Sequence, residues 1–257
     1  MALHSAFDLT GRTALVTGGS KGLGKAMARG LAEAGAAIVI SSRNEDELRA
    51  AAADIASGLS SRVEYIVADM TNRAHLEALA RQSLARMGRI DVLINNAGSN
   101  VPQAADEIND ADWDRLLELN LSSCMSLTRA LVPQMKQRRW GRVVYISSVL
   151  GLSGREGRSA YCSTKSALIG LARAGALDLG PFGITVNCIA PGPFLTDLPG
   201  KLLTDEQKQT FADTTALGRW GRPEELQGVA LLLSSDAGSY ITGTTVVVDG
   251  GVLSRCF

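Results

Sequence analysis

Short runs of hydrophobic, mostly β-branched residues recur along the chain and alternate with longer amphipathic segments. This alternation is typical of strands and helices that build a parallel sheet. Seven strands are predicted, at Thr13–Thr17, Ala37–Ser41, Val63–Ala68, Val92–Ile94, Arg142–Ser147, Thr185–Ile189 and Thr245–Val248. The first six are almost continuously hydrophobic, as expected for strands that helices cover on both faces.

The segments between the strands are apolar on one side and polar on the other, at helical spacing. The predicted helices are Leu23–Ala34, Glu45–Ser57, Arg73–Arg86, Asp112–Arg138, Ala160–Leu179 and Pro223–Leu233. Gly35, Gly88, Gly141 and Gly183 follow four of them, where a left-handed closing residue is expected. The pattern predicts an α/β fold, with one doubly wound, Rossmann-type domain spanning residues 1–257.

The alternation breaks down between residues 190 and 221. The breaking residues there are Pro191, Gly192, Pro193, Pro199 and Gly200. A loop of this length inside a compact domain usually has a function. We therefore expect a substrate lid around residues 190–221.

Charge and cysteine usage exclude several classes of protein. The 26 basic residues balance the 26 acidic ones without long runs of either sign, which argues against nucleic acid or a membrane surface as partners. The four cysteines and two histidines are too dispersed for a metal site. No segment has the basic and then apolar pattern of a leader, and none reaches the roughly 18 apolar residues of a spanning helix. These observations favour a protein of the reducing cytosol that acts on small molecules.

A glycine-rich turn joins the first predicted strand to the first predicted helix. Gly18 allows a tight exit from the strand, Gly22 lets backbone amides approach a pyrophosphate, and Gly24 lets the helix pack on the sheet. The helix N-terminus adds positive potential. Glycines also serve ordinary tight turns, but the position between a strand and a helix favours a dinucleotide phosphate site.

The Gly-x-x-x-Gly-x-Gly spacing and the motifs after it resemble the short-chain dehydrogenase/reductase family. Those motifs are Asn95-Asn96-Ala97-Gly98, Ser148, Tyr161-Cys162-Ser163-Thr164-Lys165, Pro191-Gly192 and Asp249-Gly250-Gly251. Any one of them could arise by chance, whereas the ordered set covers nearly the whole chain and is specific. The resemblance implies hydride transfer between a nicotinamide cofactor and a carbonyl or secondary alcohol, with Tyr161 as the general acid/base.

Four residues are expected to carry this chemistry. Tyr161 and Lys165 stand four apart on one helical face, where the ammonium favours the phenolate and lets Tyr161 exchange a proton near neutral pH. Ser148 ends an apolar strand and can orient the substrate carbonyl, with Ser147 as the internal competitor. Asn120 is a polar residue in an apolar helix. The resemblance gives it a proton-relay water, and the alternative is a structural amide.

The resemblance also assigns cofactor contacts. They are Gly18, Ser20, Lys21, Gly22, Leu23, Gly24, Ser42, Arg43, Asp69, Met70, Asn96, Ala97, Gly98, Tyr161, Lys165, Pro191, Gly192 and Thr196. Within this set, Lys165 would bind the nicotinamide ribose, Asn96 would line the adenosine side, and Asp69 with Met70 would contact the adenine. Asp69 has an alternative role as the cap of the helix after Thr71.

The end of the second strand indicates which cofactor is used. NAD sites usually carry an acid there, and here the strand ends in Ser41, Ser42 and Arg43. Arg43 can form two hydrogen bonds with a 2′-phosphate, Ser42 can donate a further one, and Lys21 supplies a second positive charge. The sequence therefore predicts NADP(H) rather than NAD. The alternative is that both cations are solvated surface charges.

The substrate pocket is expected to draw on Ser99–Gln103, Leu150–Arg158 and the lid around Pro193–Leu203. Arg155, Glu156 and Arg158 suggest a polar or anionic substrate. Two subfamilies fit the resemblance, gluconate-type polyol dehydrogenases and 3-oxoacyl-carrier-protein reductases. Arg138 and Arg139 could meet an acidic carrier protein, but Phe182 stands where another basic residue would be expected, which favours a small keto or polyhydroxy acid.

Apolar residues on two long helices suggest self-association. They are Leu127, Leu131, Leu168 and Leu171. Surplus apolar surface of this kind usually marks a subunit interface, and the resemblance implies a homotetramer or dimer; the alternative is that these side chains are core.

Two other functions remain open at this stage. The chain could be a non-catalytic dinucleotide sensor or scaffold, because a fold does not fix a function. It could also be an epimerase or dehydratase that keeps its nicotinamide bound. The retained set of four reacting residues argues against the sensor.

Overall fold

The computed structural model describes residues 3–196 and 204–254. Seven parallel strands form one sheet in the order β3-β2-β1-β4-β5-β6-β7. The strands are β1 (Thr13–Thr17), β2 (Ala37–Ser42), β3 (Val63–Val67), β4 (Val92–Asn95), β5 (Gly141–Ile146), β6 (Ile184–Pro191) and β7 (Thr245–Val248). The order reverses between β1 and β4, which opens a crevice at the carboxyl ends of the strands. The predicted α/β class is confirmed.

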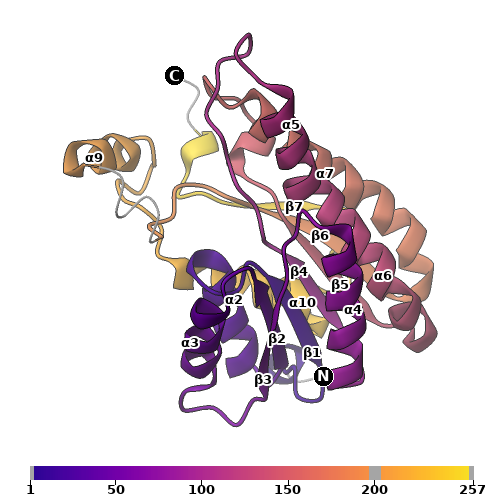
Figure 1. The fold of residues 1–257 in the computed structure, drawn as a ribbon. Helices are drawn as coiled ribbons and strands as arrows, with labels where there is room; N and C mark the ends of the chain where they lie inside the picture. Colours follow the sequence, from indigo (N-terminus) through magenta and orange to yellow (C-terminus); the bar gives the residue numbers. More distant parts are fainter. Residues whose placement is uncertain (1–2, 197–203, 255–257) are drawn as a thin grey trace.

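Helices connect the strands and lie on both faces of the sheet (Figure 1). They are α1 (Leu3–Ala6), α2 (Gly22–Glu33), α3 (Glu45–Ala56), α4 (Arg73–Met87), α5 (Asp110–Leu117), α6 (Ser123–Arg138), α7 (Ser159–Leu179), α9 (Asp205–Asp213) and α10 (Gln227–Ser234). Shorter helical turns are η1 (Glu118–Ser122), η2 (Val149–Gly151), η3 (Gly180–Phe182), η4 (Pro223–Leu226), η5 (Asp236–Gly238) and η6 (Val252–Ser254). Asn44 and Asn72 cap α3 and α4 through their side chains.

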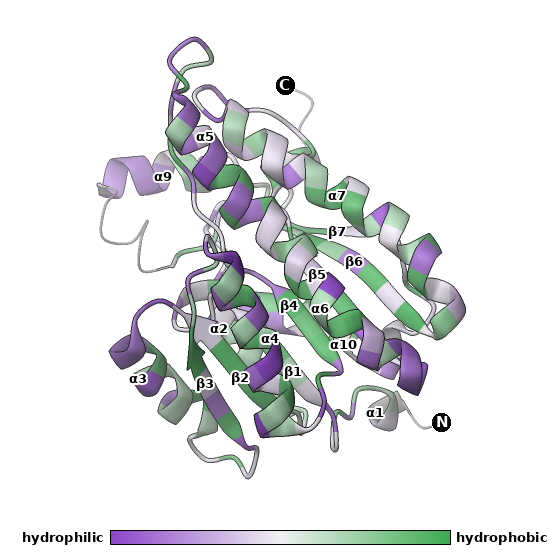
Figure 2. Cartoon of the chain, turned by 45° about the vertical axis from the view of Figure 1, so that its right-hand side comes forward, coloured by the Kyte–Doolittle hydropathy of each residue, from purple (hydrophilic) through white to green (hydrophobic). Residues whose placement is uncertain are grey.

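Alternate residues of the central strands supply two separate cores. Leu15 of β1 and Val143 of β5 pack toward α4, α6 and α7, while Val16 and Val144 pack toward α2, α3 and α10. The hydrophobic colour of the strands between largely polar outer helix faces is visible in Figure 2. Both faces of the central strands are thus covered, as their unbroken apolar runs predict.

Two local predictions are wrong. β3 is partly exposed, including Val67 at 47%, because it is an edge strand and has a neighbour on one side only. Gly141 does not close a helix. Arg139, with φ of 53°, takes the left-handed position after α6, and Gly141 begins β5 where a Cβ would lie 2.7 Å from Met135 Sδ.

The long helix predicted over Asp112–Arg138 is divided. A π-helical turn, η1, separates α5 from α6 and contains the buried Asn120. Single turns of this kind often mark functional sites.

The four leucines expected to form a surplus apolar surface on the long helices are not at the surface. Leu127, Leu131 and Leu168 are at most 1% exposed within one chain, and Leu171 packs against the same core. These side chains are core, so they give no support to a subunit interface.

The segment predicted to be a lid has more structure than its prolines suggest. Ala190 and Pro191 belong to β6, and the helix α9 stands apart from both helix layers on the side of the carboxyl ends (Figure 1). A capping box between Thr204 and Gln207 begins this helix. The spacing of these two residues is a sequence signal for a helix start that the prediction did not use. Residues 197–203, including Pro199 and Gly200, lie outside the described residues.

Candidate functional site

The glycine turn leaves β1 at the carboxyl edge of the sheet. Gly18 and Gly22 have φ of +63° and +54°, which residues with a side chain rarely adopt. A Cβ on Gly24 would lie 2.3 Å from the Gly18 carbonyl oxygen. Backbone conformation therefore favours glycine at positions 18 and 22, and close packing requires it at position 24.

Asn96 holds this turn in place. Its Nδ2 donates to the carbonyl oxygens of Thr17 (3.0 Å) and Gly18 (3.2 Å). Thr17 Oγ1 accepts from the backbone N–H groups of Asn96 and Ala97, both at 3.0 Å. The side chain of Asn96 thus fastens the end of β4 to the turn after β1, and its expected contact with adenosine stays a prediction.

The start of α2 is open to an anion. Lys21 stands at the N-cap position without a side-chain cap, so amides of the first turn are free for another acceptor. Thr196, at the start of the predicted lid, lies over the turn, since a Cβ on Gly22 would be 3.2 Å from Thr196 Cγ2. These residues form a cradle that fits a pyrophosphate.

The end of β2 offers polar groups that have no acceptor in the described structure. Ser42 Oγ is buried and has no hydrogen-bond partner there, and Arg43 is exposed beside it. The Ser42 hydroxyl proton is therefore available to a ligand oxygen. The pair therefore fits a 2′-phosphate, as the sequence predicts.

One acidic residue that the sequence analysis missed also lies here. Glu47, in the first turn of α3, accepts from Lys21 Nζ and from Ser20 Oγ, both at 3.3 Å. The Lys21 and Glu47 side chains are 61% and 42% exposed, so their ion pair is weak. Only the packing of α3 beside the glycine turn brings this carboxylate to the predicted phosphate site.

Asp69 is not the cap of α4, because Asn72 takes that position. Asp69 Oδ1 instead accepts from the N–H and the hydroxyl of Thr71, both at 2.9 Å. The hydrogen bond from the Thr71 N–H, with a smaller contribution from the charge of Arg43, holds the pKa of Asp69 below its usual range. Met70 beside it is buried in the core.

Tyr161 and Lys165 lie one turn apart in α7. Lys165 is 4% exposed, and its Nζ lies 5.6 Å from the centroid of the Tyr161 ring. Nζ donates to the carbonyl oxygen of Ile146 at 2.8 Å, which leaves two of its three N–H groups for other acceptors. A Cβ on Gly98 would lie 3.4 Å from Nζ, so this glycine keeps the approach to the ammonium open.

The structure separates the two candidate serines. Ser147 Oγ donates to the carbonyl oxygen of Lys165 at 2.8 Å and is buried against Gly151. Ser148 Oγ accepts from the Leu150 N–H at 3.1 Å, which leaves its hydroxyl proton free to donate. Ser148 is thus available to a substrate oxygen, whereas Ser147 ties β5 to α7.

Asn120 is fully buried and uses its amide within the protein. Nδ2 donates to the carbonyl oxygen of Ser99 (2.9 Å) and to Thr164 Oγ1 (3.1 Å), and Oδ1 accepts from the Ser99 N–H (2.9 Å). The Thr164 hydroxyl donates in turn to the Tyr161 carbonyl oxygen. This network favours a positioning role for the side chain, and the relay water stays a prediction.

Two buried thiols flank Lys165. Burial raises the pKa of Cys124 to about 11 and that of Cys188 to about 12, so both are neutral near pH 7. They give no counter-charge to the ammonium. Lys165 can therefore act on Tyr161 without competition from a thiolate.

Sequence reasoning missed the supporting residues Thr17, Thr164 and Glu47. Thr164 lies inside the Tyr-x-x-x-Lys motif, which is a signal that could have drawn attention to it. Glu47 carries no such signal, because its contacts join residues that are far apart in the chain. Ser99 was expected to line the pocket, but its hydrogen bonds to Asn120 were not foreseen.

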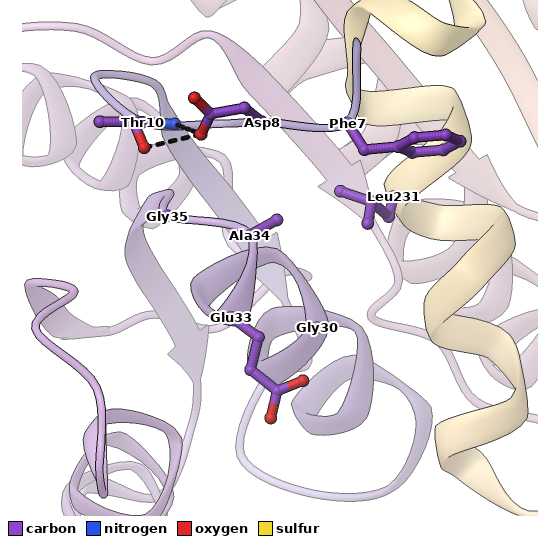
Figure 3. Close-up of a pocket in the computed structure, with 8 residues that line it drawn as sticks. All are labelled: Phe7, Asp8, Thr10, Gly30, Glu33, Ala34, Gly35 and Leu231. Atoms are coloured by element: carbon purple, nitrogen blue, oxygen red, sulfur yellow. Dashed lines mark hydrogen bonds between the residues drawn. The ribbon is translucent and has the colours of Figure 1, made fainter. Parts of the chain in front are cut away.

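A separate hollow lies away from this site, between the end of α2, the segment before β1, and α10 (Figure 3). Both of its acidic residues have partners: Asp8 accepts from the N–H and hydroxyl of Thr10, and Glu33 pairs with Arg29. The hollow contains none of the predicted site residues and lies at the amino-terminal edge of the sheet, so it is not the candidate site.

Comparison with known proteins identifies the family. Residues 12–207 match the model of the short chain dehydrogenases. Nodulation protein G of Rhizobium sp. (strain N33) is 37% identical over 96% of this chain and 98% of its own length.

Two solved structures share the fold. One is a 3-oxoacyl (acyl-carrier-protein) reductase from Agrobacterium tumefaciens with NADP bound (32% identity, TM-score 0.93, 97% of both chains). The other is a gluconate 5-dehydrogenase from Burkholderia cenocepacia in complex with NADP and tartrate (35% identity, TM-score 0.91, 98% of this chain and 99% of that one). With these matches and the assembled motifs, the chain belongs to the short-chain dehydrogenase/reductase family of oxidoreductases, which act on carbonyl and alcohol groups.

Proposed function

We propose that the chain is an NADP(H)-dependent oxidoreductase whose catalytic residues are Tyr161, Lys165 and Ser148, with Asn120 in support. The observation that carries the proposal is the buried Lys165 ammonium beside the Tyr161 ring, at the carboxyl edge of a doubly wound sheet. The whole chain would act as one catalytic domain, with the segment around residues 190–221 as its lid.

The cofactor fits the groups present at the glycine turn. Amides at the start of α2 and Thr196 would hold the pyrophosphate, while Ser42, Arg43 and Lys21 would hold the 2′-phosphate. Both solved relatives described above contain NADP. Two further predicted contacts, Pro191 and Gly192, lie at the end of β6, where a Cβ on Gly192 would be 2.6 Å from Asp249 Cα. Close packing against Asp249 therefore also requires a glycine at position 192.

When bound, the nicotinamide supplies or accepts the hydride. Ser148 donates its free proton to the substrate oxygen and orients it toward the Tyr161 hydroxyl. Tyr161 gives a proton to that oxygen in reduction and takes it back in oxidation. The Lys165 ammonium lies beside the Tyr161 ring, and its two remaining N–H groups would bind the nicotinamide ribose.

Two substrate classes are compatible with the relatives, a small keto or polyhydroxy acid and a 3-oxoacyl thioester. The structure removes one argument for the second. Arg138 bonds the Ile90 carbonyl oxygen and Asp91, and Arg139 bonds the Pro181 carbonyl oxygen, all at the amino-terminal edge of the sheet. Neither arginine is near the mouth of the site, so we retain the keto or polyhydroxy acid.

The first test is a fluorescence titration with NADPH and NADH, followed by absorbance at 340 nm with a panel of carbonyl substrates. The panel contains keto-gluconates and short 3-oxoacyl thioesters. Selective NADPH binding with turnover supports the proposal. Tight binding without turnover on any carbonyl would favour a non-catalytic sensor, and substrate conversion without change in absorbance would favour an epimerase or dehydratase.

We expect Glu47→Gln to tighten NADPH binding. The Glu47 carboxylate competes for Lys21 and Ser20 and repels a 2′-phosphate, so its loss should lower the Kd for NADPH roughly three- to ten-fold. The Kd for NADH should stay unchanged. Asp46→Asn is the matched control, because Asp46 is in the same helical turn but pairs with Arg49. Equal effects of both substitutions on NADPH would contradict a specific role for Glu47.

We also propose a homo-oligomer, a dimer or tetramer, in the reducing cytosol. β7 is an edge strand whose Val247 is exposed, and exposed edges of this kind favour pairing. Cys124, Cys162 and Cys188 are free thiols. In the described part of the chain, no helix is long and apolar enough to cross a membrane. Light scattering during size-exclusion chromatography measures the assembly directly.

A further inference from the structure

Two arginines stand at the entrance to α7, on the same side as the reacting residues. Arg158 is the N-cap residue of α7, and its carbonyl oxygen accepts from the Cys162 N–H at 2.8 Å. It lies three positions before Tyr161, at the end of α7 that carries this residue. A bridge between Gln103 and Arg158 joins this segment to the wall formed by residues 99–103.

Neither arginine has an acidic partner among the described residues. Arg158 Nη1 donates only to the Gly157 carbonyl oxygen at 3.2 Å, and the neighbouring Glu156 is exposed and forms no ion pair in that part of the chain. Burial, and then the charge of Arg155, lowers the pKa of Arg158 below its ordinary value. The charge of Arg155 thus acts on Arg158, and neither guanidinium forms an ion pair in the described part of the chain.

Several other arginines of the described chain pair with an acid. Arg73 pairs with Glu118 at 2.9 Å, and Arg219 pairs with Glu225 at 2.8 Å. Arg43 and Arg173 also form no ion pair in the described part of the chain, so the missing acid alone does not mark a site. What distinguishes Arg158 is its place beside the proposed general acid/base, which is where a substrate group would arrive.

Arg155 also contacts helix α9 of the proposed lid. Its guanidinium lies 4.7 Å from the centroid of the Phe211 ring in α9. Phe211 packs against Trp220 with ring centroids 5.2 Å apart, and Trp220 Nε1 donates to the Lys208 carbonyl oxygen. Arg155 thus spans from the wall of the site to the lid helix and adds positive charge between them.

We propose that the substrate carries a carboxylate and that Arg158 binds it, with Arg155 as a second positive charge closing the pocket from the side of α9. A planar guanidinium binds a carboxylate through two parallel hydrogen bonds. Because Arg158 is one helical turn before Tyr161, the carboxylate lies only a few bonds from the reacting carbonyl. This inference rests on the proposed function and selects a small keto acid over a neutral 3-oxoacyl thioester.

The test compares substrates that share the reacting ketone and differ in the carboxylate. Initial rates with NADPH are measured for 3-oxobutanoate and 4-oxopentanoate against their methyl esters, and for 5-keto-D-gluconate against L-sorbose, in which a hydroxymethyl group replaces the carboxylate. The wild type should favour the acid in at least one pair by about ten-fold or more in kcat/KM. In Arg158→Gln, KM for that acid should rise about 10- to 100-fold while the rate with the neutral partner is unchanged.

Two further variants make the result specific. Arg158→Lys keeps the charge and should retain part of the preference for the acid. Arg173→Gln removes the same charge from an exposed position farther along α7 and should leave the preference intact. Unchanged NADPH affinity in Arg158→Gln shows that the variant is folded.

The possible failures are distinguishable. If the neutral partner is preferred in every pair, or if Arg158→Gln slows acid and neutral substrates equally, the carboxylate site is wrong while the oxidoreductase remains. If the wild type binds NADPH but turns over none of these carbonyls, the proposed function fails and this inference falls with it.

Discussion

Tyr161→Phe is expected to lower kcat/KM by about 10²–10⁴-fold, which is the usual contribution of a positioned general acid/base. The substitution removes only the hydroxyl, and that hydroxyl has no hydrogen-bond partner in the described residues, so no buried group is left unpaired. The melting temperature and the Kd for NADPH should therefore stay close to those of the wild type. Rates at 340 nm, a thermal melt and a fluorescence titration measure the three quantities.

Tyr240→Phe is the matched control. Tyr240 is fully exposed, and the same loss of a hydroxyl there should change none of the three quantities. A Tyr161→Phe variant with more than about one tenth of the wild-type kcat/KM would remove Tyr161 from the proton transfer. The fault would then lie in the proposed role and not in the fold, because binding and stability are measured in the same preparation.

Arg43→Asp is expected to reverse the cofactor preference. The substitution replaces a cation that can form two hydrogen bonds with the 2′-phosphate by an anion that repels this phosphate. The new carboxylate can also accept a hydrogen bond from the ribose 2′-hydroxyl of NAD. The Kd for NADPH should rise by about 100-fold, and the Kd for NADH should fall. Because Arg43 is exposed and forms no ion pair in the described part of the chain, stability should change little.

The control for charge is Arg81→Asp, at an exposed position of α4. It changes the net charge by the same amount far from β2 and should leave both dissociation constants unchanged. An unaltered NADPH affinity in Arg43→Asp would mean that Arg43 is a solvated surface charge. Ser42 and Lys21 would then have to bind the phosphate without it.

Local signals in the sequence predicted most of the fold. β1 and β7 have the predicted bounds, since each is a β-branched run between turn residues. α6 ends at Arg138 as predicted, but the role of Gly141 was wrong, because it is a packing glycine against Met135, which no local pattern distinguishes from a closing one. The lid helix α9 was missed because nearby prolines and glycines outweighed its capping box.

The sequence alone determined which residues could react and in what order the motifs occur, because glycine turns, Tyr-x-x-x-Lys spacing and strand ends are local features. Only the tertiary structure decided which polar groups meet. The pairing of Ser147 with Lys165, the contact of Glu47 with Lys21, and the position of Arg155 against Phe211 all join distant segments. Such contacts depend on how helices pack across the sheet. The hydrophobic periodicity of the sequence is a local property, so it cannot predict them.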